Sequence, residues 1–196
     1  SRRPFDLQDT FDWLVAQSED PANPLYGCVE ADDGYVSSGY SFGGYTAYVN
    51  GGALVNQWWV PTLDYSDDRV RGVIAFAPWN AWGYLSSGTS EIQAPVLTIG
   101  GDSDMTVGSQ YRDLHGYVAS TPRAMASFPY AGHFSFTPIY CVTWGNGCGP
   151  YYVDETVMTD FVKTSVLAFS EHIRGRDGAI DQMPVEDGNF TWSYAL

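Results

Sequence analysis

A serine flanked by small residues stands between two apolar stretches in the first quarter of the chain. The segment GYSFGG (residues 39–44) places a glycine two positions before and two positions after Ser41. A serine that acts as a nucleophile sits on a strained turn between a strand and a helix, where bulky neighbours would collide. The backbone N–H of Phe42 would then face the oxyanion that develops during acyl transfer. The same spacing also occurs in ordinary glycine-rich turns, so this segment alone does not decide between the two.

A serine hydroxyl needs a base, and that base needs a carboxylate that orients it. The chain contains three histidines. Two of them, His115 and His172, fall inside segments with helical patterns, where a packing or surface role is favoured. His133 lies in the loop FPYAGHFSF after an apolar run, and an imidazole there can contact two partners. The sequence therefore predicts His133 as the base.

Two carboxylates follow an apolar run that lies between the serine and the histidine. Asp102 and Asp104 come directly after PVLTIGG, at the C-terminal end of a predicted buried strand. The chain order Ser, Asp, His, each just past a strand, is that of the α/β-hydrolase triad. Asp102 also suits a turn-capping role. Position alone leaves both residues as candidates for the acid.

Short-range patterns predict the elements that must position these side chains. Leu7, Phe11, Leu14 and Val15 follow helical spacing, with Asp6 placed to cap the helix. The further expected elements alternate between strands and helices, which favours a parallel α/β sheet covered on both faces. They are a strand that ends at Ser41, a helix over 42–49, strands over 69–78 and 94–101, a helix over 109–118, a strand over 123–129 and a long helix over 155–173. The tail after residue 174 is expected to be irregular.

Size and charge limit the classes of partner. With 196 residues and 44% hydrophobic content, residues 1–196 are predicted to form one domain with its own core. The net charge of −14 comes from 23 acidic and 9 basic residues, which disfavours a nucleic-acid partner and an anionic membrane surface. No apolar run is long enough to predict a transmembrane segment.

The three cysteines suggest one disulfide. Cys141 and Cys148 close the short segment CVTWGNGC, and we expect them to pair. A metal site is the less favoured reading, because no CxxC or paired-histidine spacing accompanies them. Cys28 is then either a free buried thiol or the partner of a cysteine outside this chain.

Four segments in combination resemble a known family. RPFDLQDTFDWL, GYSFGGYTA, IGGDSDMTV and AGHFSFTPIYC resemble secreted α/β hydrolases of the platelet-activating-factor acetylhydrolase and dienelactone hydrolase group and, more distantly, bacterial polyester hydrolases. The resemblance runs from about Arg3 to the final long helix. It implies a secreted or periplasmic serine esterase that cleaves short or medium acyl esters or aromatic esters and needs no metal or organic cofactor.

The resemblance also implies a role for individual residues. Ser41 would be the nucleophile and His133 the base, and the family's G-x-x-D arrangement assigns the acid to Asp104, with the other aspartate of that segment as runner-up. Trp79 in FAPWN resembles an aromatic residue that lines the acyl or aryl pocket of polyester-cleaving relatives, although a core position is the alternative. Tyr40 stands where the family often has histidine, and it is assigned to substrate binding.

The chain departs from the family at its start. The family has about four strands ahead of RPFDL, and a loop among them supplies the second oxyanion donor. Without an upstream neighbour, the strand that ends at Ser41 would expose unpaired backbone groups. We expect a second polypeptide, the N-terminal piece of a precursor cut before Ser1, with Cys28 as a candidate bridge to it.

Two other functions fit the same residues. One is a non-catalytic binding or assembly subunit that has kept a hydrolase fold. The other is an amidase or acyltransferase that uses the same triad, because a fold does not by itself determine the reaction.

Overall fold

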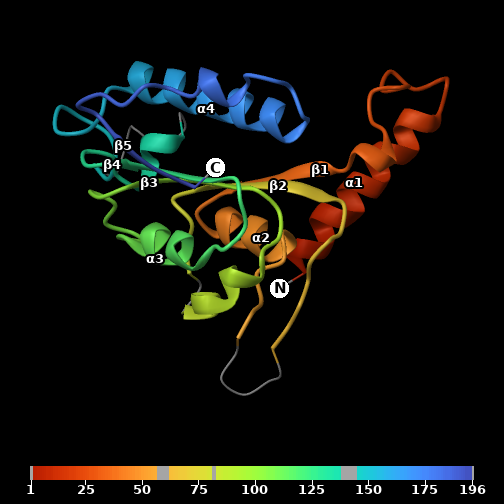
Figure 1. Ribbon diagram of the computed structural model, residues 1–196, viewed down its shortest axis with the longest axis horizontal. Helices are drawn as coiled ribbons and strands as arrows, with labels where there is room; N and C mark the ends of the chain where they lie inside the picture. The colour runs from red at the N-terminus through yellow and green to blue at the C-terminus, as the bar shows by residue number, and fades with distance from the viewer. Residues whose placement is uncertain (1, 57–61, 81–82, 138–144, 196) are drawn as a thin grey trace.

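The computed structural model describes residues 2–56, 62–80, 83–137 and 145–195. They form an α/β protein with a five-stranded, mostly parallel sheet flanked by helices (Figure 1). The spatial order of the strands is β1-β2-β3-β4-β5; the first four are parallel, and β5 runs antiparallel to β4. The strands are β1 (Tyr35–Tyr40), β2 (Val70–Phe76), β3 (Val96–Gly101), β4 (Arg123–Phe128) and β5 (Thr191–Ala195). The predicted α/β class and its four parallel strands are confirmed.

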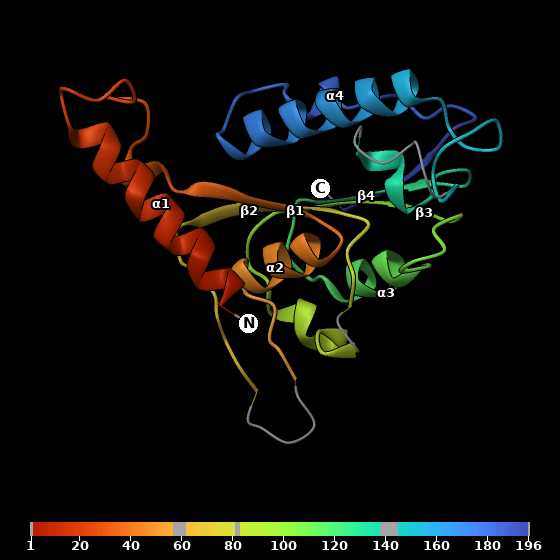
Figure 2. The same ribbon diagram turned by 180° about the vertical axis from the view of Figure 1, so that it is seen from behind.

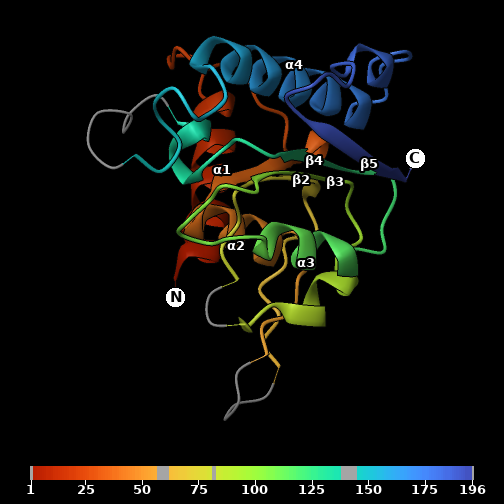
Figure 3. The same cartoon turned by 90° about the vertical axis from the view of Figure 1, so that its left-hand side faces the viewer.

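Helices cover both faces of this sheet. Helix α4 lies across one face, and α2 and α3 lie across the other, an arrangement that is also visible from behind and from the side (Figures 2 and 3). The α-helices are α1 (Arg3–Glu19), α2 (Phe42–Asn50), α3 (Gln110–Tyr117) and α4 (Glu155–Ile173). Short 3-10 turns occupy Ala31–Asp33, Ser86–Glu91, His133–Phe136 and Ile180–Gln182. Within the described residues, no helix combines the length and the apolarity that crossing a bilayer requires.

The apolar runs of β2 and β3 lie inside the protein because both of their faces are covered. Successive side chains of a strand point to opposite faces. Val73 of β2 accordingly packs in a cluster with α2 and α3, whereas Ile74 packs in a second cluster with β3, β4 and α4. Phe128 and Phe169 are fully buried in that second cluster. The sheet is therefore the rigid layer from which the loops at the strand ends project.

Two local expectations were wrong. Helix α1 begins at Arg3, so Asp6 lies inside its first turn and does not cap it; Pro4 is accommodated in that first turn, where a fixed φ and a missing N–H cost nothing. The tail after residue 174 contains β5 in addition to irregular segments. In its five residues Trp192 and Tyr194 alternate with Thr191, Ser193 and Ala195, which is the period-2 pattern of a strand; the expectation of an irregular tail overlooked it.

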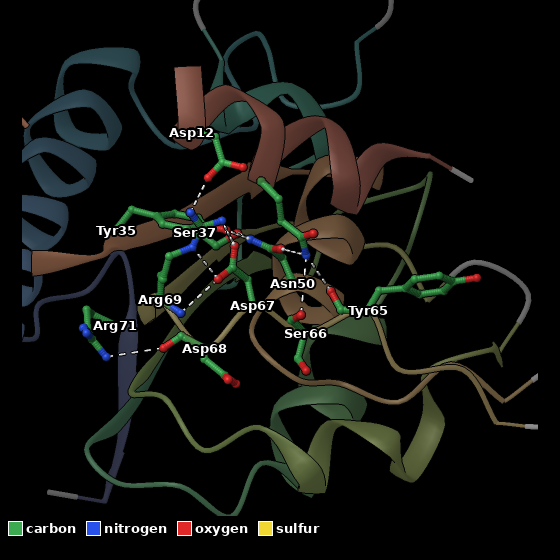
Figure 4. A network of polar contacts seen from close by, with 11 residues as sticks. Asp12, Tyr35, Ser37, Asn50, Tyr65, Ser66, Asp67, Asp68, Arg69 and Arg71 are labelled. Atoms are coloured by element: carbon green, nitrogen blue, oxygen red, sulfur yellow. Dashed lines mark hydrogen bonds and ion pairs between the residues drawn. The ribbon is translucent and has the colours of Figure 1, made fainter. Parts of the chain in front are cut away.

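A polar network ties α1 to the beginning of the sheet (Figure 4). Arg69, just before β2, forms ion pairs with Asp12 of α1 and with Asp67, the latter at 2.7 Å. The hydroxyl of Tyr35, the first residue of β1, donates to Asp67 Oδ2 at 3.1 Å, and Asn50 Nδ2 donates to that hydroxyl at 2.6 Å. This network fixes the end of β1 opposite to Ser41.

Candidate active site

Ser41 occupies the turn between β1 and α2. Its φ of 56° lies in the left-handed region, which a residue with a side chain adopts only when the surrounding structure imposes it. The Ser41 N–H donates to Phe76 O of β2 at 2.8 Å, and Ser41 O accepts from Tyr45 N and Trp79 N at 3.2 and 3.1 Å. The turn is therefore held from the sheet and from the helix at once.

The two glycines of the motif have different roles in this turn. A Cβ on Gly39 would lie 2.2 Å from the main chain of Gly43, so the close approach of β1 and α2 excludes a side chain there. A Cβ on Gly43 would meet nothing within 4 Å. The expected need for a small residue is therefore found at Gly39. Gly43 contributes its main chain to this contact, and a side chain at Gly43 would not clash.

The structure brings Ser41, His133 and Asp104 together. His133 Nε2 lies 2.9 Å from Ser41 Oγ, and His133 Nδ1 lies 2.7 Å from Asp104 Oδ2. His133 and Asp104 are 3% and 5% exposed, so their contact is shielded from water. Each of the three residues follows a parallel strand (β1, β3 and β4), and the carboxyl ends of parallel strands meet at one edge of the sheet.

The two candidate carboxylates have different surroundings. Asp104 Oδ2 faces His133, while Asp104 Oδ1 accepts the N–H groups of Thr106 and Val107 at 2.7 and 3.0 Å. Asp104 therefore has two roles: it faces the histidine, and it caps the turn, which was the role expected of Asp102. Asp102 instead pairs with Arg112 at 2.7 Å and accepts from the Tyr111 hydroxyl at 2.6 Å. Asp104, and not Asp102, is in position to orient the imidazole.

The N-terminus of α2 provides one donor for an oxyanion. Phe42 is the first residue of the helix, and an N–H at that position has no acceptor within the helix. The positive end of the helix dipole lies at the same place and favours negative charge. The geometry thus suits the role predicted for Phe42.

The two predicted substrate-binding aromatics contact different neighbours of the serine, Phe42 and His133. The ring of Trp79 packs edge-on against the Phe42 ring at 5.4 Å between centroids, and Trp79 is only partly buried. Tyr40 lies with its ring centroid 4.9 Å from that of His133, and its hydroxyl donates to His133 O at 3.1 Å. Burial raises the pKa of Tyr40, with a further contribution from the negative charge of Asp104, so the phenol stays a neutral donor. Tyr40 therefore also supports the histidine loop.

The predicted cysteine pairing involves Cys141, which lies outside the described residues. Cys148 lies within them and is partly buried. Cys28 is an exposed thiol, so the predicted buried state is wrong, and a bond to a cysteine of another chain stays a prediction.

Sequence reasoning missed Asn146, which lies inside the segment assigned only to a disulfide. Asn146 is 7% exposed, and its side-chain oxygen accepts from His133 N and Met105 N at 3.0 and 3.2 Å. It thus contacts the loops of both the histidine and the acid. The only signal in the sequence is its place between two glycines, which is also typical of an ordinary turn.

Two further observations complete the description of the site. A cavity of about 860 Å³ lies between the turn His133–Phe136 and the start of α4, lined by Phe136, Met158 and Val162 among others, but the three triad residues do not line it. Among the described residues, no three His, Cys, Asp or Glu side chains are grouped so that they could hold a metal ion.

No protein-family model matches the chain, and no curated protein matches it in a sequence search.

Proposed function

We propose that this protein is a serine carboxylic-ester hydrolase that works through an acyl-enzyme on Ser41. The observation that carries the proposal is the continuous chain of contacts from Ser41 Oγ through the His133 ring to the Asp104 carboxylate, at 2.9 and 2.7 Å. Both distances lie within the range over which a proton can be passed. No metal or organic cofactor enters the proposed reaction.

In the acylation step, His133 Nε2 takes the proton from Ser41 Oγ as that oxygen attacks the ester carbonyl. The charge on the carbonyl oxygen is stabilised by the Phe42 N–H and the N-terminus of α2. Asp104, hydrogen-bonded to Nδ1, keeps the ring in the tautomer whose Nε2 can accept a proton. The protonated ring then donates to the leaving alcohol, and the acyl group stays on Ser41.

In the deacylation step, a water molecule attacks the acyl-enzyme. His133 takes a proton from that water, and the same Phe42 N–H stabilises the second tetrahedral intermediate. Collapse of the intermediate releases the acid and returns the proton from Nε2 to Ser41 Oγ. The cycle therefore leaves the triad unchanged.

The proposed substrate is a short or medium acyl ester or an aromatic ester, small or polymeric. Trp79 and Phe42 form an aromatic surface beside Ser41, and aromatic side chains pack well against apolar or aromatic acyl groups. Together with the strained turn and the order of the triad along the chain, this supports assignment to the α/β-hydrolase fold. We also infer an exported protein, secreted or periplasmic, on the resemblance to secreted hydrolases and the predicted disulfide.

A second polypeptide is part of the proposal. Strand β1 is the last strand of the sheet on its side among the described residues. Since Ser41 N bonds to β2, strand alternation turns the backbone groups of Val36, Ser38 and Tyr40 to the other edge. An unpaired edge of this kind binds an extended segment readily. We infer that an N-terminal chain of the same precursor adds a parallel strand here and supplies the second oxyanion donor.

Cys28 lies close to this edge. It lines a cavity of about 590 Å³ together with Tyr35 and Val36 of β1, and its thiol is exposed. A disulfide from Cys28 to the second polypeptide would hold the added strand in place. Intact mass measured with and without reductant tests this idea: a second species should appear only after reduction, and an active protein whose mass is the same in both conditions would refute the bridge.

Labelling with a fluorophosphonate tests the enzymatic function directly. The probe should modify Ser41 in the native protein, and Ser41→Ala should abolish labelling. Labelling that is absent from the native protein would support the main alternative, a binding or assembly subunit without activity. A panel of esters, amides and acyl acceptors separates an esterase from an amidase or acyltransferase, because only the preferred class should show turnover that depends on Ser41.

A further inference from the structure

Asn146 joins the two loops that carry the acid and the base. Its Oδ1 accepts two main-chain N–H groups, that of His133 at 3.0 Å and that of Met105 at 3.2 Å. Its Nδ2 donates to Thr106 Oγ1 at 2.9 Å, and its own backbone oxygen accepts from Phe134 N at 2.9 Å. One asparagine therefore bonds to the residue after Asp104, to the next residue, to the base and to the residue after the base.

The segment that carries Asn146 makes close main-chain contacts with the histidine loop at two glycines. A Cβ on Gly132 would lie 2.4 Å from Gly147 N and 2.8 Å from Asn146 Oδ1. Gly147 has a φ of +119°, and a Cβ there would lie 2.5 Å from Ser135 N. Ser135 Oγ in turn donates to Gly147 O at 3.0 Å. Because neither segment can shift alone, displacement of Asn146 would displace the main chain of His133.

These contacts control the distance on which the proposed mechanism depends. Asp104 is fixed from its own side, since its Oδ1 accepts from Thr106 N and Val107 N. The separation between Asp104 Oδ2 and His133 Nδ1 then depends on what holds the 104–107 turn against the histidine loop. Asn146 Oδ1 makes that connection, because this one atom accepts an N–H from each of the two loops. The site is buried, so loss of the oxygen would leave both N–H groups without an acceptor, which costs free energy.

We propose that Asn146 is a positioning residue that holds the loops of Asp104 and His133 at hydrogen-bonding distance, so that the carboxylate can orient the imidazole. It is not a catalytic residue, because its side chain hydrogen-bonds to main-chain and threonine groups and not to Ser41 Oγ or the imidazole ring. The proposal rests on the proposed function, since it assigns Asn146 a place in the same site. It also predicts that loss of the side-chain oxygen acts on turnover and not on substrate binding.

The test compares Asn146→Ala with Asn146→Asp. The alanine variant should lower kcat by about 10- to 100-fold with KM nearly unchanged, because a shift of about 1 Å in a catalytic group costs roughly that much. The aspartate variant keeps an oxygen that accepts both N–H groups, and the Thr106 hydroxyl can donate to its other oxygen. It should restore kcat to within a few-fold of the native value.

Asn50→Ala is the matched control for general destabilisation. Asn50 is also a buried asparagine that bridges separate segments, through bonds to Tyr35 and Gln8, but it lies at the far end of α2 from Ser41. Its loss should lower Tm while kcat per folded molecule stays unchanged. If Asn146→Ala lowers kcat no more than this control, or if Asn146→Asp is as impaired as the alanine variant, the positioning role is refuted.

A spectroscopic arm separates this proposal from the proposed function. The Nδ1 proton of His133, bonded to Asp104, should give a downfield proton resonance that disappears in His133→Gln. It should persist in Asn146→Asp and Asn50→Ala and be lost or broadened in Asn146→Ala. A native protein without activity or labelling would refute the esterase function alone, whereas an unchanged resonance in Asn146→Ala would refute the positioning role even in an active enzyme.

Discussion

The two ends of β1 carry polar clusters of different character. At its start, Tyr35 joins a network in which Arg69 pairs with Asp67 and Asp12 (Figure 4). Just past its end, Ser41 contacts an imidazole that is backed by a single carboxylate. In the first cluster the charges are paired, and the hydrogen bonds of Arg69 lower the pKa of Asp67. In the second, the ion pairs found among the described residues give Asp104 one partner, the His133 ring, which is a cation only when protonated.

The difference follows from the direction of the strands. The carboxyl ends of parallel strands lead into helix N-termini, which attract negative charge and leave N–H groups available. The amino ends receive the chain from helix C-termini and loops, and polar residues there join elements to one another. We therefore expect substitutions at the carboxyl ends to change activity and those at the amino ends to change stability. The predictions below test that separation.

The largest expected effect is the loss of turnover on removal of the nucleophile or base. Ser41→Ala or His133→Ala should lower kcat by about 10⁴- to 10⁶-fold, and the double variant should be little worse than either single one, because the two residues act as a unit. Thermal unfolding should change by only a few degrees. Ester hydrolysis and Tm are measured on the same preparations; a single variant with more than a tenth of native activity would contradict the triad.

The second prediction separates the two aspartates. Asp104→Asn should lower kcat by about 10⁴-fold, because the amide favours the wrong tautomer of the base. Asp102→Asn changes a carboxylate that contacts Arg112 and Tyr111, and its kcat should stay within a few-fold of native. If the two variants exchanged these outcomes, Asp102 would be the acid.

The third prediction concerns a buried row of hydrogen-bonded side chains that links α3, β3 and α2. His115 Nδ1 lies 2.9 Å from Thr98 Oγ1, which lies 2.6 Å from the Tyr48 hydroxyl. Burial lowers the pKa of His115 to about 4, so the unfolded chain binds its proton more readily than the folded protein does. The free energy of unfolding should fall as the pH drops from about 6.5 to about 4, by about 3 kcal/mol from this group.

Urea unfolding at several pH values measures how steeply the free energy of unfolding changes with pH. His115→Asn, whose side chain can still bond to the Thr98 hydroxyl, should reduce the slope between these pH values. A native-like slope in His115→Asn would show that other groups cause the loss.

The smallest expected effect is at the start of β1. Arg69→Met leaves Asp67, whose side chain is 7% exposed, without its cation and should cost about 1–3 kcal/mol of stability. Activity per folded molecule should not change. Arg71→Met is the matched control, because Arg71 is exposed and contacts only main-chain oxygens; it should cost less. A drop in kcat with Arg69→Met at an unchanged folded fraction would contradict the separation between the two ends.

Most of the sheet could be predicted because its signals are local. The buried strands β2 and β3 are apolar runs bounded by charge, proline or glycine, and α4 has apolar residues at helical spacing over 19 residues. Strand β5 also has a local signal, since Trp192 and Tyr194 alternate with small or polar residues, but its partner could not be predicted in this way. It lies at an exposed edge, and its pairing with β4 comes from contact with residues some 70 positions earlier in the chain.

The sequence by itself determined the elements and the order in which Ser41, the aspartates and His133 follow the strands, since helical and strand periodicity are properties of neighbouring residues. The tertiary structure decided which aspartate faces the imidazole, that the Tyr40 hydroxyl supports the histidine loop, and that Asn146 joins that loop to the acid. These three outcomes depend on where separate loops meet in space. A difference of two residues after β3 changes the partner from His133 to Arg112; position after the strand left both aspartates open, and only the G-x-x-D arrangement of the resemblance favoured Asp104.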